Sequence, residues 1–343
     1  MSQRLTAEKV QVADSAEAVS NLFLEKGWTD GLPIIPPTEE AVEMMLTGMN
    51  KDPQDTVAVV PPQWGEATVE KIAINAVMAG ALPEYLPLIV TAIVALCEEP
   101  FNLRGIQATT HPVSPLLIVN GLLAKQLNIH SKSGAFGPGW RSNATIGRAI
   151  RLVLMNIGGA FPGKTDMATQ GQPGKYTLCI AENEEKSPWE PLHVERGFDA
   201  TTSTVTVVGS ENPHNINDHT AIAAEEVLTT IVSTMTTMGN NDILLQGGNP
   251  VLALGPEHAA TIAQDGFSKS AVKDFIHEKA RIPRKKFYKR AIERYYLKMN
   301  EDALIPITPD KDDLIVIVVG GPGKHSSYLP TFGWSRSITK AIL

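Results

Sequence analysis

Short apolar runs, each ending in a turn that contains glycine, recur four times after the first third of the chain. They cover 115–121, 203–215, 249–259 and 313–326. Runs of this length, rich in Val, Ile and Leu and bounded by glycine, predict buried β-strands. In the second and third runs a helical pattern follows the turn, which is typical of an α/β protein.

Helical periodicity dominates the first hundred residues. Apolar side chains recur at helical spacing over 13–26 and 39–49, and the intervening 27–38 holds three prolines and two glycines, which excludes regular structure there. The segments 68–80 and 86–97 have little polar surface. Helices of this kind are expected to pack beneath a sheet.

The expected fold is therefore α/β, a multilayer structure with a mixed or parallel sheet flanked by helices, as one body or as two α/β lobes. We divide the chain into an N-terminal helical arm with its proline-rich loop over 1–56, a first α/β lobe over 57–175 and a second over 176–343. The glycine- and proline-dense stretch 158–175 is the predicted linker or lid. A basic helix is expected over 285–299, at the surface or in a subunit contact.

Charge narrows the range of partners. The chain has 343 residues, with 30 lysines and arginines against 37 aspartates and glutamates, and so a formal net charge of −7. Such a chain has no general attraction to phosphate backbones, so nucleic acid is not an expected partner. The longest apolar run, 86–97, falls short of the ~20 residues that cross a bilayer, and the first residues lack the apolar region of a signal peptide. We expect a cytoplasmic protein that does not bind membranes and forms a homo-oligomer.

The two cysteines, Cys97 and Cys179, lie far apart and belong to no C-x-x-C motif. This spacing predicts neither a disulfide framework nor a zinc ribbon, and it fits a reducing compartment. Cys179 ends a predicted strand, where a nucleophilic thiol is one interpretation and a small buried hydrophobic side chain is the other.

Histidines mark three of the four glycine-containing turns: His214, His258 and His325. Ligands of open α/β sheets bind at the carboxyl ends of strands, so these are the candidate catalytic residues. His258 falls in the first turn of a predicted helix, whose positive end favours the neutral imidazole of a base or metal ligand. Should the three rings converge, they could hold a divalent metal with one open position. Otherwise they would act separately as acid, base and orienting group.

An anion-binding site is expected in the glycine-rich segment 134–152. Its glycines leave backbone N–H groups unobstructed, and a helix begins near Ser142, so an anionic group could bind there with Arg141. The neighbours Trp140 and Asn143 complete this substrate-binding set. A purely structural turn is the alternative, since the segment matches neither G-x-G-x-x-G nor the Walker A motif.

Four further polar groups complete the predicted site. Glu182 and His193 come from the densest polar segment, 179–198, and could supply an acid, a base or a ligand. Lys269, in the first turn of the next helix, is expected to hold substrate charge. Lys324 precedes His325 in the last glycine-rich turn and is a candidate for substrate binding.

Four long motifs together resemble one bacterial family. They are GWTDGLPIIPPT, HSKSGAFGPGWRSNATIGRAIRL, CIAENEEKSPWEPLHVERGF and GPEHAATIAQDGFSK, and the likeness spans nearly the whole chain. The family is described as UGSC-type (seleno)protein-like, after a selenocysteine-Gly-Ser-Cys motif. The resemblance implies little about activity. Neither cysteine here lies in a Cys-Gly-Ser-Cys run, so a redox role implied by the family's name has no matching motif.

These observations predict an enzyme that acts on a small, anionic molecule by histidine-based acid–base chemistry, metal-assisted or not, as a hydrolase or lyase. No nicotinamide or flavin fingerprint is present, and a divalent metal is the cofactor left open. The alternatives are a partner-dependent subunit of a thiol- or selenol-linked reductase, with Cys179 or a partner residue as the redox group, and a ligand-binding protein without catalysis.

Overall fold

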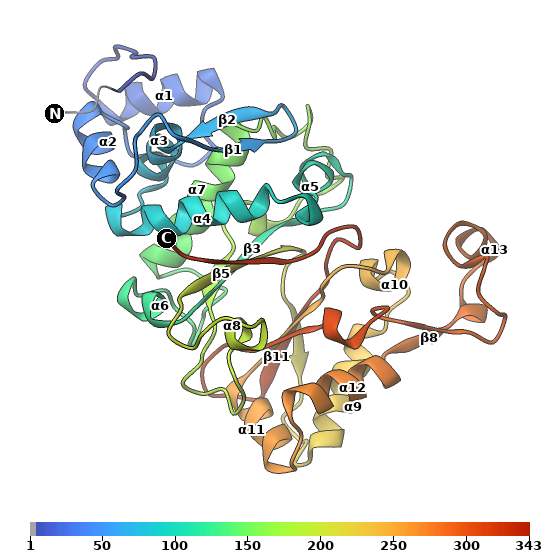
Figure 1. Ribbon diagram of the computed structural model, residues 1–343. Coiled ribbons are helices and arrows are strands. Elements are labelled where there is room, and N and C mark those ends of the chain that lie inside the picture. Colours follow the sequence, from blue (N-terminus) through green and yellow to red (C-terminus); the bar gives the residue numbers. More distant parts are fainter. Residues whose placement is uncertain (1–4) are drawn as a thin grey trace.

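Two four-stranded sheets lie at the centre of the structure, a computed structural model that describes residues 5–343 (Figure 1). The helices are α1 (Ala16–Lys26), α2 (Glu39–Leu46), α3 (Val69–Ala79), α4 (Leu86–Leu96), α5 (Leu103–Ala108), α6 (Leu122–Gln126), α7 (Arg141–Asn156), α8 (Leu192–Glu195), α9 (Ala224–Met235), α10 (Asn241–Leu245), α11 (Pro256–Gln264), α12 (Lys269–Lys279) and α13 (Lys289–Ala291). The strands are β1 (Thr56–Val60), β2 (Gly65–Thr68), β3 (Ser114–Asn120), β4 (Cys179–Ala181), β5 (Thr204–Ser210), β6 (His214–Asn217), β7 (Val251–Leu254), β8 (Arg281–Pro283), β9 (Leu304–Pro306), β10 (Ile315–Val318), β11 (His325–Leu329) and β12 (Ile338–Ala341). The predicted α/β class is confirmed.

Both central sheets are mixed. The first sheet has the strand order β12-β5-β3-β4, in which β3 and β4 are parallel and β5 runs antiparallel to its neighbours. The second sheet has the order β10-β7-β11-β6, in which β10 and β7 are parallel and β11 runs antiparallel to β7 and β6. The carboxyl ends of β7 and β10 therefore lie side by side.

The two sheets share a buried apolar core through one face each. Side chains alternate along a strand, and in β3 Leu116 and Ile118 lie in this shared core while Leu117 and Val119 pack against helices. In β10, Ile315 and Ile317 face the shared core in the same way. The result is four layers: helices, first sheet, second sheet, helices.

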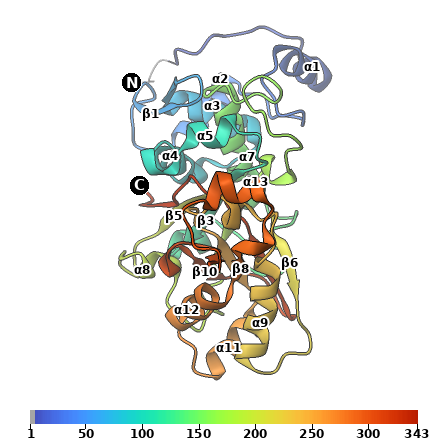
Figure 2. The same cartoon turned by 90° about the vertical axis from the view of Figure 1, so that its right-hand side faces the viewer.

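Helices cover the outer face of each sheet. The apolar helices α3, α4 and α7 form one core with the first sheet, and α9, α11 and α12 form another with the second. Figure 2 shows these two helical groups at opposite ends of the molecule, with β3, β5 and β10 between them. Local signals set the helix starts. Thr68 and Ser268 each accept a hydrogen bond from a first-turn N–H at the starts of α3 and α12.

The chain between 285 and 299 does not form the continuous basic helix predicted there. A 3₁₀ turn spans Arg284–Lys286, α13 covers three residues, and a π-helical turn follows over Ile292–Tyr296. The aromatic rings explain the breaks, because Phe287 and Tyr296 are buried against each other with centroids 5.0 Å apart. The segment is thus anchored to the protein by its aromatic residues.

The first sheet contains strands from both predicted lobes. β4 and β5 follow residue 175, yet both pair with β3, which precedes it. The C-terminal strand β12 returns to the edge of the same sheet and pairs with β5. A domain boundary at 175/176 would therefore run through one hydrogen-bonded sheet.

Among residues 5–343, no single helix combines the length and apolar character of a membrane span. One sharply bent pair, Pro83–Leu96 with Glu99–Ala108, satisfies those criteria by length and composition only.

Candidate functional site

A cavity of about 320 Å³ opens at the carboxyl ends of β7 and β10. Its wall on one side is the loop 133–137, and on the other it is the glycine-rich connection from β10 to β11. The strand β11 contributes His325, Ser326 and Ser327. The position matches the crevice where α/β sheets bind ligands, so this is the candidate site.

At two glycines the chain segments around this cavity approach each other closely. A Cβ atom on Gly255 would overlap the carbonyl oxygen of His325, and one on Gly321 would overlap the side chain of Ser133. Any larger residue would push β7 from β11, or one loop from the other. The glycine-containing turns in the sequence therefore reflect close packing at the site.

His325 is the one titratable side chain among the residues that line the cavity. Its Nδ1 lies 3.0 Å from Oδ1 of Asn215, and its Nε2 lies 3.1 Å from Nε2 of His219. Because the amide oxygen only accepts, the neutral ring of His325 carries its proton on Nδ1 and presents the Nε2 lone pair. His219 then donates its Nε2–H to that lone pair. The Nε2 atom of His325 is thus the basic atom of this pair, and both residues are exposed.

His258 lies beside the cavity but does not open into it. Its side chain is only 1% exposed, and its Nε2–H donates to the carbonyl of Asp218 at 3.0 Å. Its Nδ1 accepts from the hydroxyl of Ser326 at 2.8 Å, and that hydroxyl accepts from the N–H of Gly255. Burial lowers the pKa of His258, which favours the neutral ring, whereas the sequence attributed that preference to the positive end of the helix. The expectation that His258 faces the cavity is wrong, because both ring nitrogens are used to join α11 to β11.

The three predicted metal-binding histidines do not converge. His214 lines a different cavity, His258 is sealed by its two hydrogen bonds, and His325 is paired with His219. Within the described part of the chain, no group of three His, Cys, Asp or Glu side chains is arranged to hold a metal ion. The Nε2 atoms of His219 and His325 lie 3.1 Å apart at the cavity. These two atoms would be the protein ligands of a cation bound there.

In the glycine-rich segment 134–152, the side chains predicted to bind substrate contact other parts of the protein. The ring of Trp140 stacks on His130 with centroids 3.9 Å apart, and the side chain of Asn143 bonds both the N–H and the carbonyl of His130. Arg141 points elsewhere, and its Nε donates to the carbonyl of Gly80. None of these three predicted substrate-binding residues lines the cavity: Trp140 and Asn143 hold the loop at His130, and Arg141 bonds Gly80.

The two predicted lysines also have protein partners. Lys324 donates to the carbonyl of Ala221 at 2.7 Å. Lys269 is buried, and its ammonium group bonds the carbonyl of Glu190 and the carboxylate of Glu195, which also binds Lys273. Neither lysine lines the cavity.

Glu182 and His193 belong to a polar cluster buried near the end of the first sheet. The carboxylate of Glu182 accepts from the side-chain amide of Asn120 and from the N–H of Leu192. Burial raises the pKa of Glu182 to about 7. Among the residues that the structure describes, both ring nitrogens of His193 and Oε1 of Glu182 lack a hydrogen-bond partner. The cluster is separate from the cavity and is sealed from solvent.

Both cysteines are unsuited to thiolate chemistry. Cys179 is only 4% exposed, and burial raises the pKa of its thiol to about 12. Burial and the nearby Glu98 raise the pKa of Cys97 to about 12 as well. These thiols remain protonated at neutral pH.

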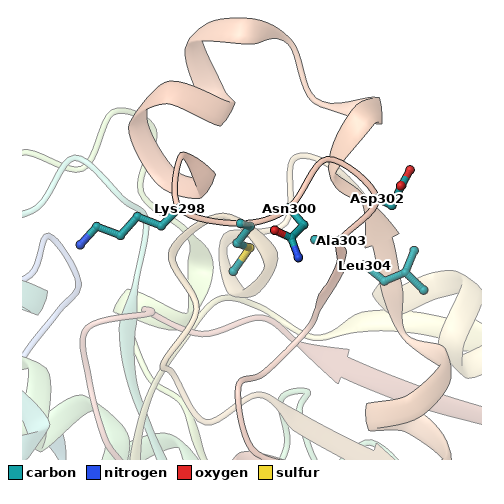
Figure 3. Close-up of a pocket in the computed structure, with 6 residues that line it drawn as sticks. Lys298, Asn300, Asp302, Ala303 and Leu304 are labelled. Atoms are coloured by element: carbon teal, nitrogen blue, oxygen red, sulfur yellow. The ribbon is translucent and has the colours of Figure 1, made fainter.

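Another cavity, of about 490 Å³, lies beside the 284–304 region (Figure 3). One continuous stretch, 298–304, supplies its lining, and Lys298 and Asp302 point away from each other. No set of functional groups converges there, so it carries no site.

Three residues of the candidate site were missed from the sequence: His219, Asn215 and Ser327. His219 and Asn215 come from β6 and the turn after it, and they meet His325 only because β6 pairs with β11. The dipeptide Asp218-His219 follows a predicted strand, which was the one available signal. No family model, curated protein or solved structure matches this chain, so the site stands on its own geometry.

Proposed function

We propose that this protein is an enzyme acting on a small anionic molecule in the cavity between the 133–137 and 320–323 loops. The reaction is a hydrolysis or an elimination driven by the His325–His219 pair. The observation that carries the proposal is His325 itself, which lines the cavity with one ring nitrogen fixed by Asn215 and the other paired with His219 at 3.1 Å.

The surroundings of His325 favour an anion. No carboxylate is among the residues lining the cavity, although Glu257 reaches its rim to accept from the N–H of Gly323, and Ser133 and Ser327 supply hydroxyl groups. Such donors stabilise negative charge that develops on a reacting oxygen. In the reaction, Nε2 of His325 takes a proton from the substrate in place of the one offered by His219, while Asn215 holds the ring through Nδ1–H, in the manner of a base with an orienting partner.

A divalent metal ion, if it takes part in the proposed reaction, would bind to the two histidine rings. The Nε2 atoms of both histidines would act as two ligands, with water or substrate completing the shell, and Asn215 would hold the ring of His325 from behind. Such an ion would polarise a substrate oxygen. The proton-transfer role and the metal-ligand role use the same lone pairs, so each excludes the other at a given moment.

The reductase alternative would need its redox group from a partner, since both thiols are held protonated by burial. A binding protein without catalysis would use the same cavity and retain ligand without turnover. The expected homo-oligomer and cytoplasmic location stay predictions.

The test is a turnover screen with two reaction classes. p-Nitrophenyl acetate and p-nitrophenyl phosphate report hydrolysis, and small 3-hydroxy acids report elimination through the absorbance of the conjugated product. Turnover by the wild-type protein should fall by at least about a hundredfold in His325→Gln, the range of one lost acid–base group. His277→Gln, on the surface of α12, is the matched control. Equal turnover in both variants would remove His325 from the mechanism.

A further inference from the structure

Two segments of the chain carry opposite charge. The acidic arm, residues 5–46, holds eight aspartates and glutamates against two lysines, so its formal charge is −6. The basic segment, residues 284–298, holds seven lysines and arginines against one glutamate, so its formal charge is +6. Glu301 and Asp302 directly after it lower the local total to +4. In a chain with a net charge of −7, such a positive cluster is a candidate binding surface.

The charges of both segments lie mostly at the surface. Within the acidic arm, Asp30 is paired with Arg148 of α7, and Glu39 is paired with Lys9. The exposed acids include Glu8, Asp14, Glu17, Glu25 and Glu40. Within the basic segment, Glu293 lies 3.8 Å from Lys289 and offsets its charge. The exposed bases include Lys285, Lys286, Arg290, Arg294 and Lys298.

The helix α1 of the acidic arm gains little from its own chain. None of its eleven residues is buried. Phe23 packs against the core beneath and against Trp28, with ring centroids 5.4 Å apart. A helix of this length is marginal in water unless packing covers one of its faces. We therefore expect another surface to cover α1.

The outer face of α1 combines apolar and acidic side chains. Glu17, Asn21, Leu24 and Glu25 recur at helical spacing, and all four are exposed, Leu24 to 50%. Met44 of α2, in the same arm, is 61% exposed. Such a face suits a partner that has both apolar and basic side chains.

The basic segment has this combination. Phe287 and Tyr296 are buried and fix the segment to the protein, whereas Tyr288 and Leu297 are 73% and 67% exposed. The exposed tyrosine and leucine thus lie among the exposed bases of the same short segment. Apolar contact supplies affinity, and complementary charge supplies specificity.

The two surfaces cannot meet within one copy. Figure 1 shows α13, in the basic segment, on one side of the molecule and α1 and α2 on the other. The start of the arm is also held in place, because the carboxylate of Glu70 accepts from the N–H groups of Thr6 and Ala7 at 2.9 Å. A second copy of the chain can bring its own arm to the basic segment.

We propose that this protein self-associates by contact between the acidic arm of one copy and the basic segment of another. Glu17 and Glu25 of α1 pair with bases of the segment, around an apolar contact of Leu24 with Tyr288 and Leu297. Since the contact joins unlike surfaces, it closes as a reciprocal dimer or as a ring. The proposal is independent of the reaction at His325, so either can fail alone.

Sedimentation velocity with charge-reversed proteins tests the proposal. The arm variant carries Glu17→Lys and Glu25→Lys, and the segment variant carries Lys286→Glu and Arg290→Glu. The wild-type protein should sediment as an oligomer. In each variant the dissociation constant should rise by at least about a hundredfold, because like charges then face each other. A protein with all four substitutions should associate again, since both surfaces have changed sign.

The control variant carries Glu190→Lys and Glu225→Lys, the same change in charge at exposed positions outside both surfaces, and it should associate as the wild type does. Three results would overturn the proposal: a wild-type protein that stays monomeric at its highest soluble concentration, unchanged association in the arm and segment variants, or no recovery in the fourfold variant. A monomer whose basic segment binds phosphatidylserine vesicles would assign that surface to a lipid instead.

Discussion

Replacing His258 by alanine separates a structural role from a catalytic one. The ring joins two elements that are distant in sequence, because it accepts from Ser326 on β11 and donates to Asp218 after β6. In His258→Ala the Ser326 hydroxyl loses its acceptor and the Asp218 carbonyl loses its donor. We expect the protein to fold with reduced stability.

The size of the loss follows from these two groups. Each buried polar group left without a partner costs about 1–3 kcal/mol, which gives roughly 2–6 kcal/mol in total. The space vacated by the ring adds to this, because the site is 1% exposed and packed on all sides. His258→Asn should lose less, since its side-chain oxygen can still accept from Ser326.

The effect should also depend on pH. Burial lowers the pKa of His258 in the folded protein, so the unfolded chain binds the proton more readily. The stability that His258 contributes is therefore complete above its unfolded pKa of about 6.5 and is lost as pH falls through the folded value. The difference between wild type and His258→Ala should shrink from pH 7.5 to pH 5.

Urea unfolding followed by circular dichroism at these two pH values measures both effects. His277→Ala is the control, with a partly exposed ring and one long hydrogen bond of 3.3 Å, and it should stay within about 0.5 kcal/mol of the wild type. A His258→Ala protein as stable as the wild type, or a stability gap that widens towards pH 5, would refute the reasoning.

Three further experiments test other parts of the structure. Glu182→Gln removes a carboxyl group whose pKa burial raises from 4.5 to about 7. In urea unfolding, the stability of the wild type should decline by about 3 kcal/mol as pH rises through that window, whereas the stability of the variant should stay constant. The same decline in both proteins would contradict this. Cys179 should react with Ellman's reagent at pH 8 only after unfolding, because burial raises its thiol pKa to about 12; rapid labelling of the native protein would revive the reductase alternative. Gly321→Ala should cost about 1–3 kcal/mol by overlap with Ser133, and Ser133→Gly should restore much of it in thermal melts; a double variant no more stable than Gly321→Ala would argue against that contact.

The strands were predictable because their signals are local. The runs at 115–121 and 249–259 became β3 and β7, since buried strands need continuous apolar sequence with glycine where the chain turns. The return of β12 to the first sheet was not predictable, because strand pairing across more than a hundred residues leaves no local pattern.

The sequence predicted the location of the site, at the carboxyl ends of strands, but not the residues that form it. Of the three predicted histidines, His325 lines the crevice, His258 is sealed beside it and His214 lines another cavity. The face to which a strand residue points depends on strand alternation. Ser326 and Tyr328 face the helices, so Ser327 and His325 face the opposite side, where the cavity lies. His219 meets His325 only through the β6–β11 pairing.

The most direct test of the central claim is an NMR titration of the histidine rings with sodium acetate and with inorganic phosphate. The ring nitrogens of His325 and His219 should shift together and saturate with at least one of these anions, because His325 lines the proposed site and His219 contacts its ring. The resonances of His214, which lines a different cavity, should not move. Saturable shifts at His214 alone, or no saturable shift at His325 with either anion, would contradict the account.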